Sequence, residues 1–353
     1  MNKEGELSVP VDLIRTIAIV GVILLHASND FTVQQMTLLE IFRWSTVDVY
    51  QSIGRLGVPL FVMLTGALLL QPSKDESLSV FFKKRWARIG LPFLFWGAAY
   101  FGWDFFVEHQ AFTSNTIIKG ILTGPYYQFW YLYMLMGLYL LTPILRILVA
   151  HADRKIMKYF VILWFLGASI IPFVGFFTTY YMDSNVVIIT GFVGYFILGT
   201  YLLTVRMRRS TLLVFMSLGV ALTAIGTYLL AATVGGKEMF FFQLYFSPTL
   251  IFASVMLFLL LNTIQPPSVN NKDTSRPKVN KLLKVISQNT LPIFLFHAMV
   301  LESFQRGYFG FAINGNTINS IIGVPLITVV TLFICLGVII PLKKIPVLKR
   351  LIG

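Results

Sequence analysis

Two ionisable side chains stand out in the first apolar stretch of the chain, residues 10–28 (PVDLIRTIAIVGVILLHAS). Arg15 and His26 are eleven residues apart. A helix turns about 100° per residue, so this spacing puts both side chains on one face. They then lie about 16 Å apart along the axis. A histidine can take up a proton near neutral pH, as a general base must. The pair predicts a helix face that supports acid–base chemistry beside a fixed positive charge.

Both residues also have structural explanations that involve no chemistry. Arg15 could extend to lipid headgroups as an anchor, and His26 could bond a backbone carbonyl near the opposite membrane surface. The shared face favours the functional interpretation, because a stripe with both groups must face a polar cavity rather than lipid.

A second arginine pair lies in the segment FFKKRWARIGLPF, residues 81–93. Arg85 and Arg88 are one helical turn apart and so share a face. Forked guanidinium groups bind phosphates through two parallel hydrogen bonds, so the pair is a candidate phosphate site. The alternative is plain anchoring at the cytoplasmic surface, which is the better interpretation of the neighbouring Lys83 and Lys84.

Five further residues are weaker candidates for substrate binding, because their polar or aromatic side chains fall within or beside apolar stretches. The aromatic residues could equally belong to an interfacial belt, and the histidine and the carboxylate could be structural hydrogen-bonding groups. The five are Arg55, Trp130, Tyr131, His297 and Glu302.

Composition identifies the class of protein. Of the 353 residues, 56% are hydrophobic and 12% are charged, whereas soluble domains carry about 25% charged residues. The chain is therefore expected to be an all-α integral membrane protein. The single Cys335 excludes an internal disulfide. The four scattered histidines predict no metal site.

A helix needs about 20 mostly apolar residues to span a bilayer. The sequence predicts ten such helices in a single domain over residues 1–353, and a flexible cytoplasmic loop over residues 265–284. The predicted spans are Pro10–Ser28, Val49–Leu70, Ala87–Val107, Gln128–Val149, Ile156–Gly175, Val186–Val205, Thr211–Val234, Gln243–Thr263, Val285–Phe304 and Thr317–Pro341.

Basic residues concentrate in every second connection between these spans. With the two ends of the chain, those connections hold 22 of the 28 lysines and arginines. Lysine and arginine favour the cytoplasmic side of a membrane. Both termini are therefore predicted to be cytoplasmic, and the net charge of +13 reports topology rather than binding to nucleic acid. Membrane lipids are the expected surroundings of a multi-pass protein of this kind.

Taken together, these segments resemble the acyltransferase-3 family of multi-spanning membrane acyltransferases. Arg15, ten residues and His26 match its first-helix pattern, and Arg85-Trp-Ala-Arg88 matches its RxxR motif. VPLFVMLTGALLL resembles its VPxFFxxSG run, with Thr65 where serine is usual. FWYLYMLMGLYLLTPIL and ISQNTLPIFLFHAMVL resemble its fourth- and ninth-helix segments. The extracellular transferase domain of some members has no counterpart here.

The resemblance implies an acyl-CoA-dependent O-acyltransferase of the cytoplasmic membrane. The donor would be cytoplasmic acyl-coenzyme A, in the first place acetyl-coenzyme A. The acceptor would be a hydroxyl of a cell-surface polysaccharide, a glycolipid or a small glycoside. His26 would be the catalytic histidine and Arg15 its partner, while Arg85 and Arg88 would bind the coenzyme A phosphates.

Two other functions remain open from the sequence. A transporter or flippase for a glycolipid or small solute would also need a buried polar stripe, although the repeated halves and interrupted helices typical of transporters are not evident. A non-catalytic membrane partner or sensor is the third hypothesis.

Overall fold

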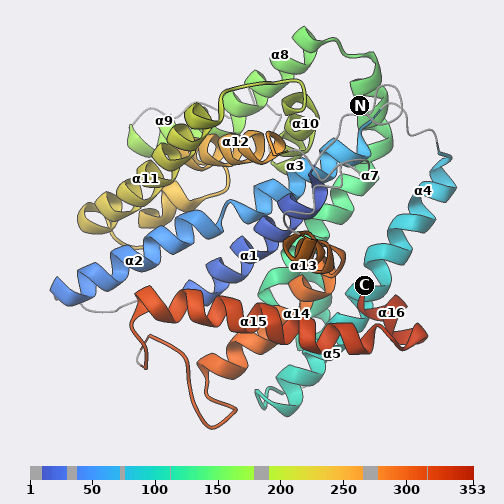
Figure 1. Ribbon diagram of the computed structural model, residues 1–353, viewed down its shortest axis with the longest axis vertical. Coiled ribbons are helices and arrows are strands. Elements are labelled where there is room, and N and C mark those ends of the chain that lie inside the picture. The colour runs from blue at the N-terminus through green and yellow to red at the C-terminus, as the bar shows by residue number, and fades with distance from the viewer. Residues whose placement is uncertain are drawn as a thin grey trace.

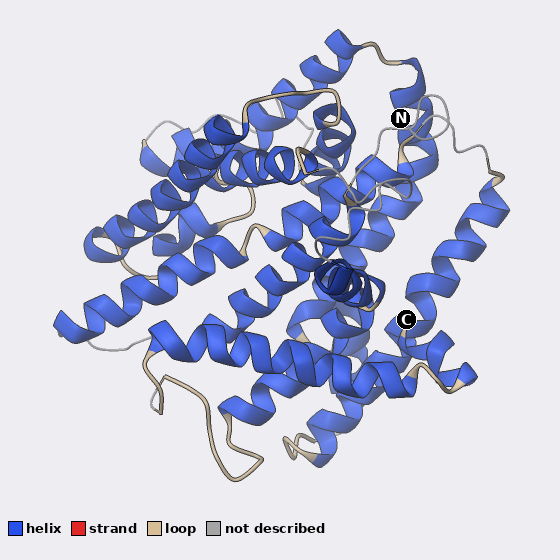
Figure 2. Ribbon diagram, viewed as in Figure 1, coloured by secondary structure: helices blue, strands red, loops and turns tan. Residues whose placement is uncertain are grey.

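The computed structural model describes residues 10–29, 38–71, 76–111, 113–178, 191–264, 277–315 and 317–353. In this part of the chain every regular element is a helix (Figure 2), so the predicted all-α class is confirmed. The first half comprises α1 (Val11–Asn29), α2 (Leu38–Gly54), α3 (Gly57–Leu69), α4 (Leu78–Arg85), the π-helical turn η1 (Trp86–Gly90), α5 (Leu91–Phe106), α6 (Ser114–Thr123), the 3₁₀ turn η2 (Tyr127–Phe129), α7 (Trp130–His151), α8 (Arg154–Phe165), the π-helical turn η3 (Leu166–Ile170) and α9 (Ile171–Phe177).

The second half comprises α10 (Phe192–Leu202), α11 (Arg209–Thr233), the 3₁₀ turn η5 (Glu238–Gln243), α12 (Pro248–Asn262), α13 (Pro277–Gln288), α14 (Thr290–Gln305), α15 (Ser320–Leu342) and α16 (Pro346–Ile352).

The loop predicted over residues 265–284 is wrong in its last part, because residues 277–284 belong to α13. Residues 265–276 lie outside the described residues. Several apolar side chains among the lysines, such as Leu282 and Leu283, allow this segment to form an amphipathic helix.

Seven helical stretches of the described residues are long and apolar enough to cross a membrane. They are Val11–Asn29, Ile41–Leu69, Ser114–His151, Arg154–Phe177, Arg209–Thr233, Glu238–Asn262 and Ser320–Leu342. The chain is thus a multi-pass membrane protein. The remaining three predicted spans fall on shorter helices, namely α5, α10 and α14. The count of ten and the cytoplasmic position of both termini stay predictions.

Helix α1 occupies the middle of the molecule (Figure 1). It packs against α2, α3, α13, α14 and α15, and Ile14, Ala18, Ile19 and Ile23 are fully buried. A helix that is apolar around most of its circumference is one enclosed by other helices. Within this enclosure Arg15 and His26 are only partly exposed.

Small residues let α1 and the α2–α3 region touch through their backbones. A Cβ atom on Gly54 would lie 2.7 Å from the Leu25 amide nitrogen, and one on Gly57 would lie 2.5 Å from the Ala18 carbonyl oxygen. Small residues at helix crossings in membranes allow this close approach. This close crossing fixes the position of α1 along its axis relative to α3.

The boundary between α2 and α3 falls at Arg55 and Leu56, which form a turn. Pro59 has no amide hydrogen to donate to the Arg55 carbonyl four residues earlier. The α-helical hydrogen-bond pattern is therefore interrupted here. The interruption places the Arg55 side chain at a break between two helices.

We expect Gly57→Ala to destabilise the protein, by about 1–3 kcal/mol as for other overpacked cores, because the added methyl group meets backbone atoms of α1. Gly137→Ala on α7 is the matched control, since a Cβ there has no neighbour within 4 Å. The unfolding temperature of each variant is measured by heating samples and monitoring the loss of monodisperse protein by size-exclusion chromatography. An equal unfolding temperature for the two would contradict the proposed crossing.

Candidate active site

A cavity of about 300 Å³ opens among α1, α3, α7, η1 and the α13–α14 region. Arg15, Arg85 and Arg88 all line it, so the structure brings together three of the four arginines that the sequence singled out. The other lining residues are Phe61, Thr65, Leu68, Leu69, Ile89, Tyr131, Leu135, Tyr139, Ser287, Gln288, Thr290, Leu291, Pro292, Phe294 and Gly353. One end of the cavity is thus strongly basic and the rest is mainly apolar.

The local fold positions Arg85 and Arg88 around the π-helical turn η1. Arg85 is the last residue of α4, and Arg88 lies within the turn. Gly90 permits this conformation, because a Cβ there would lie 2.5 Å from the Trp86 ring. π-helical turns are frequent at functional sites.

Glu76 holds the basic end of the cavity together. Its carboxylate lies 2.8 Å from the Lys84 ammonium, 3.3 Å from the Arg146 guanidinium and 3.7 Å from the Arg85 guanidinium. The hydrogen bond from Lys84 is the largest cause that lowers the pKa of Glu76 below its ordinary value, and Arg146 adds to it. Neither Glu76 nor Arg146 was a sequence candidate. The adjacent carboxylates Asp75 and Glu76, which stand among basic residues after the second predicted span, were the available signal.

Aromatic rings support the same two guanidinium groups. Arg85 lies over Phe81 and Tyr139, at 4.9 and 5.7 Å from their centroids, and Arg146 lies 4.9 Å from Phe81. The Arg146 Nε also donates to the Leu69 carbonyl at 2.7 Å. The Arg85 Nε is buried and has no hydrogen-bond partner among the described residues. It is a donor available to an anion.

His26 does not line the cavity and forms a pair with His297. The two rings are 5.3 Å apart, and Tyr127 lies 4.7 Å from His26. The expectation that Arg15 and His26 face one cavity therefore holds for Arg15 only. His297 was a weak candidate on the sequence, and the structure brings it beside the strongest one.

Hydrogen bonding fixes the tautomer of His297. Its Nδ1 lies 2.7 Å from the Phe294 carbonyl oxygen, which can only accept, so Nδ1 carries the proton and Nε2 is a bare acceptor. The residue is fully buried, and this Nε2 has no partner among the described residues. The Nδ1 of His26 is likewise buried and unpartnered. Buried polar atoms without partners are costly, so these two nitrogens call for a functional explanation.

Arg55 is held by a buried polar chain near the histidine pair. Its Nε donates to Gln243 at 3.2 Å, and Gln243 donates to Asp48 at 2.6 Å. Asp48 and Gln243 are almost completely buried. Neither residue was a sequence candidate, because Gln243 comes from η5, far along the chain from Asp48.

The remaining candidates occupy three different places. Trp130 packs 5.6 Å from the Tyr245 ring, over which the Arg55 guanidinium lies at 5.9 Å. Tyr131 lines the cavity. Glu302 accepts a hydrogen bond from Tyr126 and lies 3.8 Å from Arg306. Among the described residues no group of three potential metal ligands occurs.

A family model described as an acyltransferase domain matches residues 10–340. This match covers most of the chain and confirms the resemblance found in the sequence motifs. No curated protein and no solved structure matches the chain.

We expect Glu76→Gln to remove an acid-sensitive contribution to stability. The pKa of Glu76 is lowered in the folded protein below its ordinary value of 4.5. Its ion pairs therefore stabilise the fold at pH values above 4.5, and this contribution is lost as the pH falls through the lowered pKa. The wild type should therefore exceed Glu76→Gln in unfolding temperature at neutral pH, by the equivalent of about 1 kcal/mol or less. The difference should vanish in acid. A difference that does not change with pH would contradict the role of these ion pairs.

Proposed function

Because the chain belongs to the acyltransferase domain family, whose model matches residues 10–340, we propose that it transfers acyl groups from cytoplasmic acyl-coenzyme A. Acetyl is the proposed acyl group. The proposed acceptor is a hydroxyl of a cell-surface glycan, a glycolipid or a small glycoside. The protein itself is a membrane acyltransferase, as its family and its long apolar helices establish.

The gathering of Arg15, Arg85 and Arg88 around one cavity is the observation that carries this proposal. Coenzyme A ends in several phosphate groups, and guanidinium groups bind phosphate through charge-assisted hydrogen bonds. The apolar remainder of the cavity suits the slender pantetheine arm, which carries the thioester at its far end. The donor would thus enter with its thioester first and leave its phosphates at the arginines.

We assign the role of general base to His26. It would take the proton from the acceptor hydroxyl while the hydroxyl oxygen attacks the thioester carbonyl carbon. The carbon–sulfur bond then breaks, and the protonated histidine returns its proton to the coenzyme A thiolate. The products are an O-acyl ester and free coenzyme A thiol. Arg15 lies about three helical turns away on α1, so its proposed role is to hold the donor.

Arg55 and Trp130 are proposed to contact the acceptor. The Asp48–Gln243 chain fixes the direction of the Arg55 side chain. An arginine beside stacked aromatic rings suits a hydroxyl-rich ligand, because the guanidinium offers several donors and the rings offer apolar faces. Glu302 contacts Tyr126, whose ring lies 4.9 Å from Tyr127, and so would support the same region.

The test is to measure donor binding and thiol release with acetyl-coenzyme A and the protein in lipid nanodiscs. We expect His26→Ala to bind the donor normally and to lose about 10²–10⁴-fold in thiol release, as for removal of a general base. Arg85→Ala/Arg88→Ala should weaken donor binding at least tenfold, because hydrogen bonds to charged groups contribute about 1.5–3 kcal/mol each.

The matched control is Arg206→Ala/Arg208→Ala, which removes two exposed arginines that do not line the cavity. It should bind acetyl-coenzyme A as the wild type does. Full activity of a monodisperse His26→Ala protein would overturn the assignment of the base. Failure of the wild type to bind any acyl-coenzyme A would favour the transporter or flippase hypothesis. An acetylated His26 found by mass spectrometry in the absence of acceptor would replace direct transfer by a covalent relay.

A further inference from the structure

Three aromatic side chains line the arginine cavity at the end away from Arg146. Phe61 of α3, Tyr131 of α7 and Phe294 of α14 all line it, and each is at least 92% buried. We propose that these three residues, the aromatic collar, form the passage between the donor cavity and the histidine pair and limit the donor to short acyl groups. This inference rests on the proposed function, because it names the donor specificity of the same site.

The order of the lining residues along α3 and α7 shows which end of the cavity lies away from Arg85 and Arg146. On α3 the lining residues run from Phe61 to Leu69, and Leu69 bonds to Arg146 at the basic end. On α7 they run from Tyr131 to Tyr139, and Tyr139 lies under Arg85. On each of these two helices the collar residue lies eight residues from the lining residue at the basic end. At about 1.5 Å per residue this is about 12 Å along the helix.

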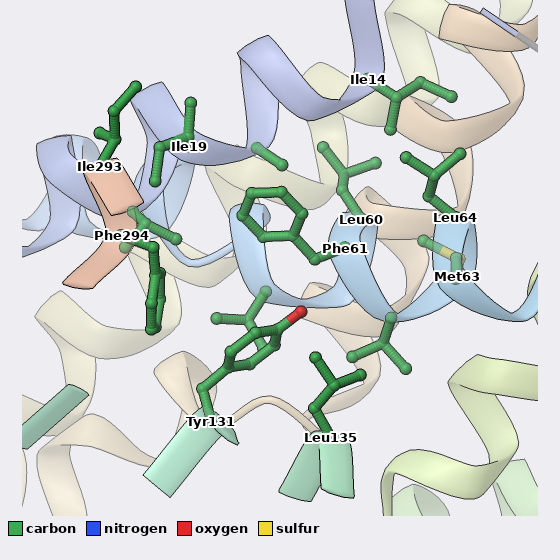
Figure 3. Packing of buried hydrophobic residues seen from close by; sticks show 14 of the residues in the cluster. Ile14, Ile19, Leu60, Phe61, Met63, Leu64, Tyr131, Leu135, Ile293 and Phe294 are labelled. Atoms are coloured by element: carbon green, nitrogen blue, oxygen red, sulfur yellow. The ribbon is translucent and has the colours of Figure 1, made fainter. Parts of the chain in front are cut away.

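The Tyr131 ring packs against both of the other collar rings. The Tyr131 centroid lies 5.0 Å from that of Phe294 and 6.1 Å from that of Phe61. Figure 3 shows the three side chains close together, contributed by three different helices. Such distances are those of packed aromatic pairs.

The histidine pair lies directly behind the collar. The Phe294 ring is 5.8 Å from the His297 ring, which is 5.3 Å from the His26 ring. The Phe294 carbonyl also accepts the hydrogen bond that fixes the His297 tautomer. Along this series of ring contacts, Phe294 and His297 lie between the cavity and the proposed base.

The position of the collar has a consequence for the donor. With its phosphates at the arginines, the acyl group is the leading end of the donor and must pass the collar to reach His26. Packed side chains resist displacement, so each methylene added to the acyl chain increases the steric clash with the collar rings. Acetyl is the smallest common acyl group with a carbon chain and meets them least. Truncation of a collar ring should therefore shift the preference toward longer chains.

The experiment compares thiol release and binding of acetyl-, butyryl- and hexanoyl-coenzyme A by the full chain in nanodiscs. We expect the wild type to favour acetyl-coenzyme A in kcat/KM. Phe294→Ala and Phe61→Ala should raise the butyryl-to-acetyl ratio by about tenfold, the size of effect that a methylene has in an apolar pocket. The milder Phe294→Leu and Phe61→Leu should shift it in the same direction if the alanine variants fail to fold.

The matched control is Phe258→Ala, which truncates a fully buried phenylalanine of α12 that does not line the cavity. It should keep the wild-type ratio. A wild type that turns over all three donors equally would overturn the collar, as would collar variants with an unchanged ratio. Failure to bind any acyl-coenzyme A would overturn the proposed function instead.

A second measurement tests the separation without a donor. Cys335 is the one cysteine of the chain, so a Cys335→Ala/His26→Cys protein carries a single thiol behind the collar. Its labelling by a small anionic methanethiosulfonate added to the cytoplasmic side should accelerate about tenfold or more when Phe294→Ala is added. Equal labelling rates with and without that substitution would contradict the barrier.

Discussion

A guanidinium and an imidazole carried by one membrane helix must both be kept away from lipid. A charged group at the bilayer centre costs at least about 2.5–3.5 kcal/mol, so the helix that carries it must be enclosed by protein. The arrangement around α1 meets this constraint. Backbone contact at Gly54 and Gly57 brings α2 and α3 against it, and α13, α14 and α15 cover its other faces. The cavity beside Arg15 and the histidine pair around His26 are both products of this enclosure.

The charges at the basic end are already organised. Glu76 bridges Lys84, Arg85 and Arg146, while Phe81 and Tyr139 support the guanidinium groups. Side chains held in this way lose little conformational entropy when an anion binds. Next to the collar, His297 has a fixed tautomer, and each of the two histidines has a buried nitrogen without a hydrogen-bond partner among the described residues. The aromatic collar divides the two environments, one suited to phosphates and one suited to proton transfer.

Sequence patterns predicted the helical class and the key arginines because these depend on local chemistry. Hydropathy identifies apolar helices, and the spacing of Arg85 and Arg88 is set by one turn of chain. The pairing of His26 with His297 could not be predicted, since it depends on how α1 packs against α14. Asp48 and Gln243 were missed for the same reason, because a buried amide becomes informative only when its partner is known. The sequence predicts a loop over residues 277–284, where the structure has a helix, because the polar and charged residues of this segment hide an amphipathic pattern.

The central claim is that one donor molecule connects the arginines to the histidine pair through the collar. An electron cryo-microscopy structure of the His26→Ala protein with acetyl-coenzyme A tests it most directly, because that variant should bind the donor without consuming it. The account predicts phosphate density against Arg85 and Arg88 and the pantetheine arm along α3 and α7, with the thioester between Phe61 and Phe294. Donor density elsewhere, or an arm that turns away from position 26, would contradict it.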